Sequence, residues 1–263
     1  MPQLDAFQLD GRTALVVGAS RGIGLAIARA MARSGARTIM AARSLSELEH
    51  HSTGLRSEGC DASPLHLDLT SGDSIRQAID ACPEIDILVN VSGINKRKRF
   101  VDYTTEEYDQ IMRTNLDGLV ELTQQAGKRM IARGKGGKVI IIGSLMSIRG
   151  LPYLTVYAMS KSALAGLTRV LAAEWGEYNI QVNCIAPGFI LTDLNRDMWK
   201  LEHLVAWRKG VQACPRIGQP EDVAPLAVFL AGSGSDYITG QVIPVDGGYS
   251  ETAVWPFAPP PAP

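Results

Sequence analysis

The chain has 263 residues, of which 46% are hydrophobic and 20% are charged, and its formal net charge is −1. A chain of this length can bury a full core as one domain, and a near-neutral charge gives no electrostatic basis for binding nucleic acid. No apolar run approaches the ~20 residues of a membrane span, and the N-terminus lacks the features of a signal peptide. The four cysteines form no Cys-x-x-Cys pair and the four histidines have no metal-ligand spacing, so we expect a cytoplasmic protein without a metal site.

Short apolar runs alternate with longer amphipathic segments along the chain. The first run, Thr13–Val17, predicts a strand, and Gly22–Arg33 predicts a helix that ends near Gly35. Continuous apolar strands between helices indicate a parallel sheet covered on both faces, which is a single doubly wound, Rossmann-type α/β domain over residues 1–263. The other strands that we expect are 38–42, 63–67, 85–90, 138–143, 181–186 and 241–245, and the other helices are 46–57, 105–133, 156–177 and 221–231.

Two segments interrupt this alternation. Residues 189–218 are the least regular and carry Met198, Trp199 and Trp207. We expect a helical lid over the substrate there, with a packed helical insertion that does not move as the alternative. Residues 251–263 are rich in proline and predict an extended, polyproline-like tail that packs at a subunit interface; a disordered terminus is the alternative.

A glycine-rich loop, Gly18-Ala19-Ser20-Arg21-Gly22-Ile23-Gly24, lies between the first strand and its helix. Glycines let the backbone approach a pyrophosphate, and the helix N-terminus supplies N–H groups and partial positive charge. No Gly-Lys-Ser/Thr follows, which disfavours a Walker-type phosphate loop. The loop therefore predicts a dinucleotide site, and the alternative is a tight turn without a ligand.

The end of the second strand indicates which dinucleotide binds. An NAD site of this type places an acidic side chain there to bind the ribose 2′-hydroxyl. This chain has Arg43-Ser44 instead, no carboxylate before Glu47, and a second cation at Arg21. Arginines suit a 2′-phosphate, so we expect NADP, unless Arg43 is only a solvated charge at a helix start.

Tyr157 and Lys161 are four residues apart and share one face of the expected helix. A phenol is a poor acid-base catalyst at its ordinary pKa near 10. A neighbouring positive charge favours the phenolate and lowers that pKa. The pair predicts a nucleotide-dependent redox enzyme in which tyrosine donates and accepts the proton.

An ordered set of motifs resembles the short-chain dehydrogenase/reductase family from about Gly11 to Gly248: the glycine loop, Asn90, Asn115, Ser144, Tyr157, Lys161 and Pro187-Gly188. The resemblance implies that Tyr157 protonates the substrate oxygen and that Lys161 lowers the tyrosine pKa and binds the nicotinamide ribose. It also implies that Ser144 polarises the carbonyl and that the backbone of Asn115 holds a water in a proton relay. Assembly as a homotetramer is a further expectation from the family.

The resemblance also assigns the cofactor contacts. Asp68-Leu69 is similar to the adenine contact of the family, Asn90-Val91-Ser92-Gly93 stands where Asn-Asn-Ala-Gly is usual, and Ile190 and Thr192 hold the carboxamide. The cofactor-binding residues that we expect are Gly18, Ser20, Arg21, Gly22, Ile23, Gly24, Arg43, Ser44, Asp68, Leu69, Asn90, Gly93, Tyr157, Lys161, Pro187, Gly188, Ile190 and Thr192.

The substrate is predicted from a basic run. Lys96-Arg97-Lys98-Arg99 follows the fourth expected strand, and Gly-Ile, basic residues and then Phe resemble gluconate and deoxygluconate dehydrogenases of the family. We expect a small carbonyl or alcohol substrate, an anionic sugar acid such as gluconate or 5-ketogluconate. The alternatives are a solvated basic run, a 3-oxoacyl-(acyl-carrier-protein) reductase that docks its acidic carrier there, and an inactive binding protein on the same fold. The expected substrate contacts are Ser144, Met146, Arg149, Tyr153 and Tyr157.

Overall fold

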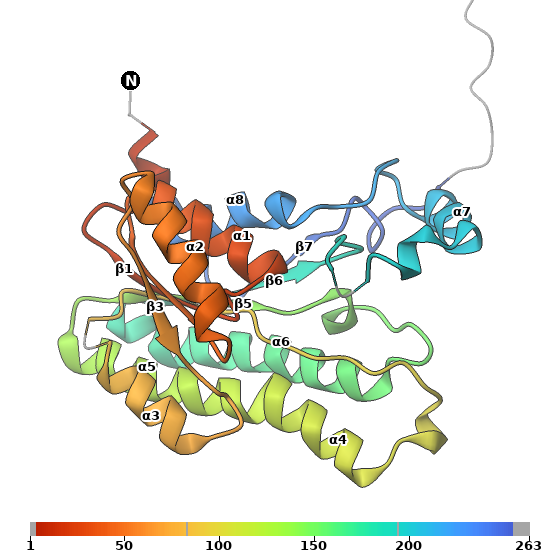
Figure 1. Ribbon diagram of the computed structural model, residues 1–263, viewed down its shortest axis with the longest axis horizontal. Coiled ribbons are helices and arrows are strands. Elements are labelled where there is room, and N and C mark those ends of the chain that lie inside the picture. Colours follow the sequence, from red (N-terminus) through yellow and green to blue (C-terminus); the bar gives the residue numbers. More distant parts are fainter. Residues whose placement is uncertain (1–3, 83, 194, 255–263) are drawn as a thin grey trace, which may run out of the picture.

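A parallel sheet of seven strands forms the centre of the molecule (Figure 1). The computed structural model describes residues 4–82, 84–193 and 195–254, so Trp255, Phe257 and the proline-rich end of the expected tail lie outside the described residues. The strand order β3-β2-β1-β4-β5-β6-β7 confirms the doubly wound Rossmann-type fold. The strands are β1 Thr13–Val17, β2 Arg37–Ala42, β3 Ala62–His66, β4 Ile87–Asn90, β5 Gly137–Ile142, β6 Ile180–Pro187 and β7 Val242–Val245.

Helices cover both faces of the sheet, as the apolar strands predict. Successive strand residues point to opposite faces, so Val16 belongs to one core while Leu15 and Val17 belong to the other. On one face lie α1 Gly22–Arg33, α2 Leu45–Ser57 and α8 Pro220–Ala231; on the other lie α3 Gly72–Asp80, α4 Thr105–Met112, α5 Gly118–Arg133 and α6 Thr155–Trp175 (Figure 1).

Two elements differ from the expected pattern. Helix α3 is additional; it is short and mostly polar, and the Ser71 hydroxyl caps it by accepting the Ser74 N–H at 3.3 Å. The expected helix 105–133 is interrupted by a π-helical turn at Arg113–Asp117, which separates α4 from α5. The predicted strand Thr13–Val17 and helix Gly22–Arg33 are confirmed, and the other predicted bounds differ by at most two residues, as helix and strand ends commonly do.

The topology fixes where a ligand binds. Strand β1 pairs with both β2 and β4, so the strand order reverses between β1 and β4. A crevice forms at such a switch point, at the carboxyl ends of the strands, on the right-hand side of Figure 1. Helix α7 Glu202–Val211 lies on this side and belongs to the predicted lid segment. No described helix has the length and apolar character needed to cross a membrane.

Candidate active site

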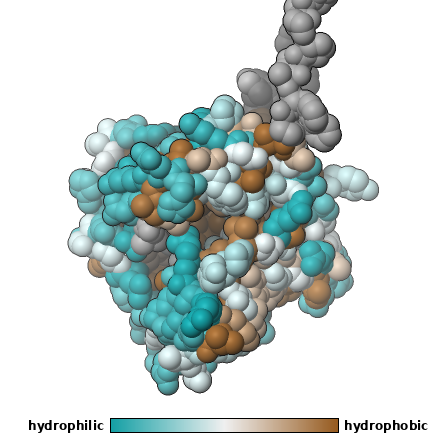
Figure 2. Space-filling model, turned by 90° about the vertical axis from the view of Figure 1, so that its right-hand side faces the viewer, coloured by the Kyte–Doolittle hydropathy of each residue, from teal (hydrophilic) through white to brown (hydrophobic). Residues whose placement is uncertain are grey.

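A large cleft opens at the carboxyl ends of the strands, and the space-filling view shows its hollow, bordered by both hydrophilic and hydrophobic residues (Figure 2). Its volume of about 1510 Å³ exceeds the ~300–1,000 Å³ of a typical small-molecule pocket, which leaves room for a dinucleotide and a substrate together. The predicted residues that line it are Gly18, Ser20, Arg21, Gly22, Ile23, Gly24, Arg43, Ser44, Asp68, Leu69, Gly93, Ser144, Met146, Tyr153, Tyr157, Lys161, Pro187, Gly188, Ile190 and Thr192.

Three predicted side chains lie outside the cleft lining. The amide of Asn90 is buried in the core and donates to Thr123 Oγ1 at 2.8 Å. The Arg149 guanidinium donates to the backbone carbonyl of Ser250, so the prediction that Arg149 faces the pocket is corrected. Asn115 is the third, and its amide is used to hold a neighbouring loop.

The glycine loop fits the close approach of a pyrophosphate. Gly18 has a φ of 84°, in the left-handed region that favours glycine, and a Cβ at Gly24 would clash with the Gly18 carbonyl oxygen, so the turn needs glycine at both positions. Arg21, at the N-terminal cap of α1, makes no side-chain capping hydrogen bond, so the first N–H groups of the helix stay available to an anion. The residues present therefore fit a dinucleotide.

Two cations border the part of the cleft next to β2. Arg21 and Arg43 are both exposed, and neither forms an ion pair with a carboxylate of the described residues. Nearby, Asp68 Oδ1 accepts the Thr70 N–H at 2.9 Å, and this bond holds the pKa of Asp68 below its usual value. Because neither Arg21 nor Arg43 is ion-paired among the described residues, both remain available to a phosphate.

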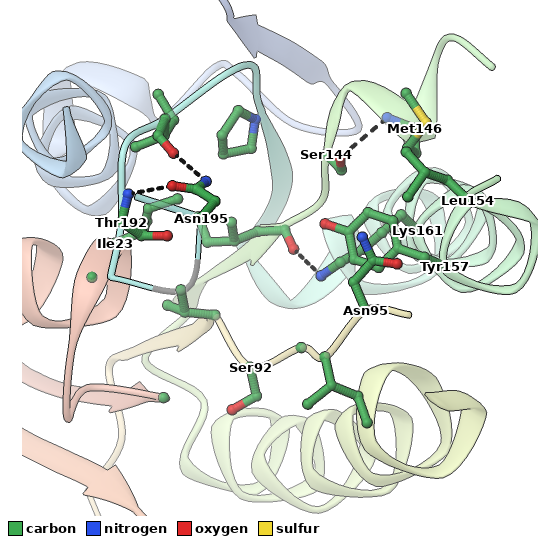
Figure 3. A pocket seen from close by; sticks show the side chains of 18 of the residues that line it. Ile23, Ser92, Asn95, Ser144, Met146, Leu154, Tyr157, Lys161, Thr192 and Asn195 are labelled. Carbon is green, nitrogen blue, oxygen red and sulfur yellow. Dashed lines mark hydrogen bonds between the residues drawn. The ribbon is translucent and has the colours of Figure 1, made fainter. Parts of the chain in front are cut away.

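Ser144, Tyr157 and Lys161 come together on one wall of the cleft (Figure 3). Ser144 follows the end of β5, while Tyr157 and Lys161 project from the first turns of α6. Ser144 Oγ accepts the Met146 N–H at 3.2 Å, and Lys161 Nζ donates to the Ile142 carbonyl at 2.9 Å. The cleft therefore holds a hydroxyl, a phenol and an ammonium close together. A substrate carbonyl oxygen can form hydrogen bonds with the hydroxyl of Ser144 and the phenol of Tyr157.

The protonation of Tyr157 differs from the expectation. Burial raises the pKa of the Tyr157 phenol, and the hydrogen bond with Ser144 and the charge of Arg97 oppose this rise only in part. Burial also lowers the pKa of Lys161 to about 8, and Lys161 Nζ lies 5.8 Å from the centre of the tyrosine ring. A weakened cation at this distance does not outweigh the cost of burying a phenolate, so Tyr157 stays protonated at neutral pH.

Asn115 lies in the π-helical turn, a feature frequent at functional sites. Its Oδ1 accepts the Ile94 N–H at 2.7 Å, and its Nδ2 donates to the Ile94 carbonyl at 2.8 Å. The side chain therefore fixes the loop that leaves β4 toward the basic run. The proton relay through the Asn115 backbone stays a prediction.

Further cleft residues are absent from the predicted set. Asn195 joins the loop after β6, because it accepts the Thr192 N–H and donates to the Ile190 carbonyl, both at 2.8 Å (Figure 3). Asn95 and His203 also line the cleft. Asn195 carries a sequence signal, a short polar side chain three residues after Thr192, which suits a local turn.

The described part of the segment 189–218 contains a short helical turn, Met198–Lys200, and helix α7, and several of its side chains line the cleft. Phe189 packs edge-on against Trp199 and Trp207, with ring centroids 5.4 and 5.5 Å apart, and these three side chains line the cleft. The buried Gln212 holds the end of the segment through bonds to the Cys214 and Arg216 carbonyls. The substrate end of the cleft thus has an aromatic wall; movement of the lid stays a prediction.

Ion pairs engage three of the four cations of the basic run, although the two carboxylates offset only two of the four positive charges. Lys98 and Lys96 share the Glu107 carboxylate, at 2.6 and 3.4 Å, and Arg99 pairs with Asp102 at 2.7 Å. Within the described part of the chain, Arg97 alone of the four has no carboxylate partner, and it lines the cleft. The run therefore offers one available guanidinium to a ligand.

The buried Lys161 makes stability depend on pH. Burial lowers its pKa from 10.5 to about 8, so between these values the unfolded chain binds more protons than the folded chain, and the free energy of unfolding rises with pH. Within this window, the free energy of unfolding of the wild type should rise by up to about 1.4 kcal/mol per pH unit more than that of Lys161→Met. Denaturant unfolding of both proteins at several pH values gives the difference between their free energies of unfolding. The contribution of groups that titrate in both proteins, such as Cys82, cancels in this difference. Parallel stability curves would contradict this role of Lys161.

Comparisons with known proteins show which proteins this chain resembles. A family model described as enoyl-(acyl carrier protein) reductase matches residues 18–250. Gluconate 5-dehydrogenase of Gluconobacter oxydans is 34% identical over 94% of this chain and 98% of its own length. A 3-oxoacyl-(acyl-carrier-protein) reductase of Pseudomonas aeruginosa is 37% identical over 91% of this chain and 98% of its own.

A solved structure has the same fold over nearly its full length. A gluconate 5-dehydrogenase from Burkholderia cenocepacia, in complex with NADP and tartrate, superposes with a TM-score of 0.91 at 37% identity, covering 95% of this chain and 99% of the other. The family match, these identities and the similar architecture lead to one conclusion: the chain is an oxidoreductase that belongs to the short-chain dehydrogenase/reductase family.

Proposed function

We propose that the protein interconverts a secondary alcohol and a ketone with NADP(H), and that its substrate is a sugar acid of the gluconate/5-ketogluconate class. The observation that carries the reaction type is the group formed by Ser144, Tyr157 and Lys161 in a cleft that also contains the glycine loop. The observation that carries the substrate class is the available guanidinium of Arg97 in the same cleft.

The three side chains have separate tasks in this reaction. When bound, the nicotinamide supplies the hydride in reduction and accepts it in oxidation. Tyr157, which burial keeps protonated, donates its proton to the substrate oxygen in reduction. Ser144 Oγ accepts the Met146 N–H, so its hydroxyl hydrogen, which also bonds Tyr157, can turn to that oxygen. Lys161 uses one N–H for Ile142 and has others for the ribose and the proton relay.

The preference for NADP(H) rests on charge. Arg43 directly follows β2, where an NAD site of this type places a carboxylate, and Arg21 adds a second positive charge. Both guanidinium groups are exposed at the cleft and suit a 2′-phosphate. The NADP in the similar Burkholderia cenocepacia structure supports the same choice.

The substrate class rests on the single available cation of the basic run. A small carboxylate needs one guanidinium, which Arg97 offers, and a bidentate contact would orient it. An acidic carrier protein needs a broader positive surface, but Lys96, Lys98 and Arg99 are paired with Glu107 and Asp102. These ion pairs favour the sugar acid over the carrier-bound substrate, although the open aromatic wall also fits an acyl chain.

The proposal is tested by comparing kcat/KM for 5-ketogluconate and for acetoacetyl-carrier protein with NADPH, in the wild type, in Arg97→Gln and in the matched control Lys96→Gln. The wild type should prefer 5-ketogluconate. Arg97→Gln should lose about tenfold or more, the scale of one charge-assisted contact, and Lys96→Gln should lose little. A preference for the carrier-bound substrate would favour the reductase of fatty-acid-type synthesis, and equal effects of both variants would remove Arg97 from the site.

We also propose a homotetramer. Val120 of α5 and Met159 and Val170 of α6 are apolar and exposed on the helical layer that covers one face of the sheet. Contact with another subunit would bury these side chains. Light scattering at micromolar concentration should give about four times the chain mass of 28.3 kDa, and a stable monomer would reject the assembly.

A further inference from the structure

Tyr153 has an unusual backbone conformation next to the catalytic helix. Its φ is 68°, in the left-handed region, where a bulky side chain is strained. Asn179 is the other non-glycine residue with positive φ in the described chain, and asparagine tolerates that region well. A glycine would adopt the backbone of Tyr153 without strain, so a tyrosine at this position carries a conformational cost.

The neighbouring structure fixes this conformation. The Tyr153 carbonyl accepts the Lys98 N–H at 3.1 Å, which ties it to the loop of the basic run. The next residue, Leu154, is buried against Leu145 and Met146, and its carbonyl accepts the Ala158 N–H at 2.8 Å in the first turn of α6. With both sides held, the backbone keeps the strained conformation whatever side chain it carries.

The side chain itself adds little to the fold. It is 58% exposed, it lines the cleft, and no hydrogen bond of its hydroxyl is found among the described residues. Leu151 and Leu154 of the same segment also line the cleft, so the ring continues an apolar wall. Packing does not account for a tyrosine at this position.

The position of Tyr153 indicates what the ring can contact. It is hydrogen-bonded to the loop that carries Arg97 and precedes by four residues the Tyr157 that meets the reacting oxygen. If Arg97 binds the carboxylate of a keto acid, the carbon chain between carboxylate and ketone passes along this wall. An aromatic ring there would pack on the C–H groups of that chain.

We propose that Tyr153 is a specificity-determining residue: its ring contacts the carbon chain of the substrate between the carboxylate and the reacting carbonyl, and the strained backbone is the cost of placing it there. This inference rests on the proposed function. The Tyr153 ring selects for keto acids whose ketone is several carbons from the carboxylate, such as 5-ketogluconate, over short keto acids such as pyruvate.

Tyr153→Gly separates this role from a structural one, because it removes the ring and the strain together. KM for 5-ketogluconate should rise about tenfold or more, while kcat and the KM for NADPH stay near the wild-type values. The thermal midpoint should be unchanged or higher, since relief of strain opposes the added freedom of the unfolded chain. Tyr153→Phe should keep the wild-type KM, and the control Asn179→Gly, a left-handed position outside the cleft lining, should leave all kinetic constants unchanged.

The possible failures are distinguishable. Wild-type turnover of 5-ketogluconate with an unchanged KM in Tyr153→Gly would overturn the role of Tyr153 and leave the proposed function standing. A raised KM together with a lower thermal midpoint and a raised KM for NADPH would show a structural role only, which also overturns the inference. A wild type that prefers pyruvate or reduces neither acid would remove the sugar-acid substrate and this inference with it.

Discussion

Tyr157→Phe is expected to lower kcat by at least about 100-fold, the usual scale of acid-base catalysis, while the affinity for NADPH stays nearly unchanged. The variant removes the only proton that the Tyr157 side chain can donate, and it keeps the ring that packs beside Leu154. Steady-state reduction of 5-ketogluconate gives kcat, and titration of the protein with NADPH gives the affinity. Lys161→Ala should reduce both, because Lys161 is assigned to the ribose as well as to the proton path.

A second tyrosine provides the control for this experiment. Tyr178, on the turn that follows α6, is 40% exposed and does not line the cleft, so Tyr178→Phe makes the same chemical change elsewhere. Tyr178→Phe should leave both kcat and the affinity for NADPH unchanged. Wild-type kcat in Tyr157→Phe would remove Tyr157 from the role of proton donor and with it the proposed chemistry.

Arg43→Asp is expected to reverse the cofactor preference. The wild type should favour NADPH over NADH by more than about tenfold, because one charge-assisted arginine contact contributes roughly 1.5–3 kcal/mol. The variant removes that contact, places a negative charge beside the 2′-phosphate, and supplies a carboxylate for the ribose hydroxyl of NAD. The ratio of kcat/KM for the two cofactors, measured at one ionic strength, gives the preference directly.

A control with the same charge change separates contact from bulk electrostatics. Arg37 is exposed at the other end of β2, and it does not line the cleft. Arg37→Asp should keep the wild-type ratio. If the wild type uses both cofactors equally, or if both variants change the ratio alike, Arg43 does not select the 2′-phosphate.

The fold was predictable because its pattern is local and repeated. The central strands are mainly apolar, and β5 and β6 are buried along their whole length, as a sheet covered on both faces requires, although β6 also buries Gln181 and Asn183. Helix α3 was missed because it is short and mostly polar, so its hydrophobic side is carried by a few residues such as Ile75 and Ile79. The π-helical turn was missed because one extra residue per turn barely disturbs a helical pattern over a long segment.

The site was predictable where motifs place residues by backbone geometry. Glycines in the loop and Tyr157 and Lys161 on one helix face follow from local spacing alone. The direction of a single side chain does not follow: Arg149 reaches the carbonyl of Ser250, about a hundred residues later in the chain. Asn90 likewise turns into the core because Thr123 of α5 lies beside it.

The availability and protonation of charged groups also could not be predicted from local spacing. The sequence indicated four cations in the basic run, but their availability depends on Glu107 and Asp102, which the fold brings to them. The pKa of Tyr157 was expected to fall because Lys161 is a neighbour, and it rises because burial of the phenol dominates. Spacing identifies a charge partner, whereas the cost of burial requires the packed structure.

The most direct test of the proposed reaction follows the hydride itself. NADPH with both hydrogens of the hydride-donating nicotinamide carbon replaced by deuterium is incubated with 5-ketogluconate and the wild-type protein, and the product alcohol is analysed by mass spectrometry. We expect one deuterium at the new carbinol carbon, with the same label formed at least about 100-fold more slowly by Tyr157→Phe. Product without deuterium, or no ketone-dependent consumption of NADPH with either 5-ketogluconate or acetoacetyl-carrier protein, would contradict hydride transfer from NADPH to the proposed ketones in this cleft.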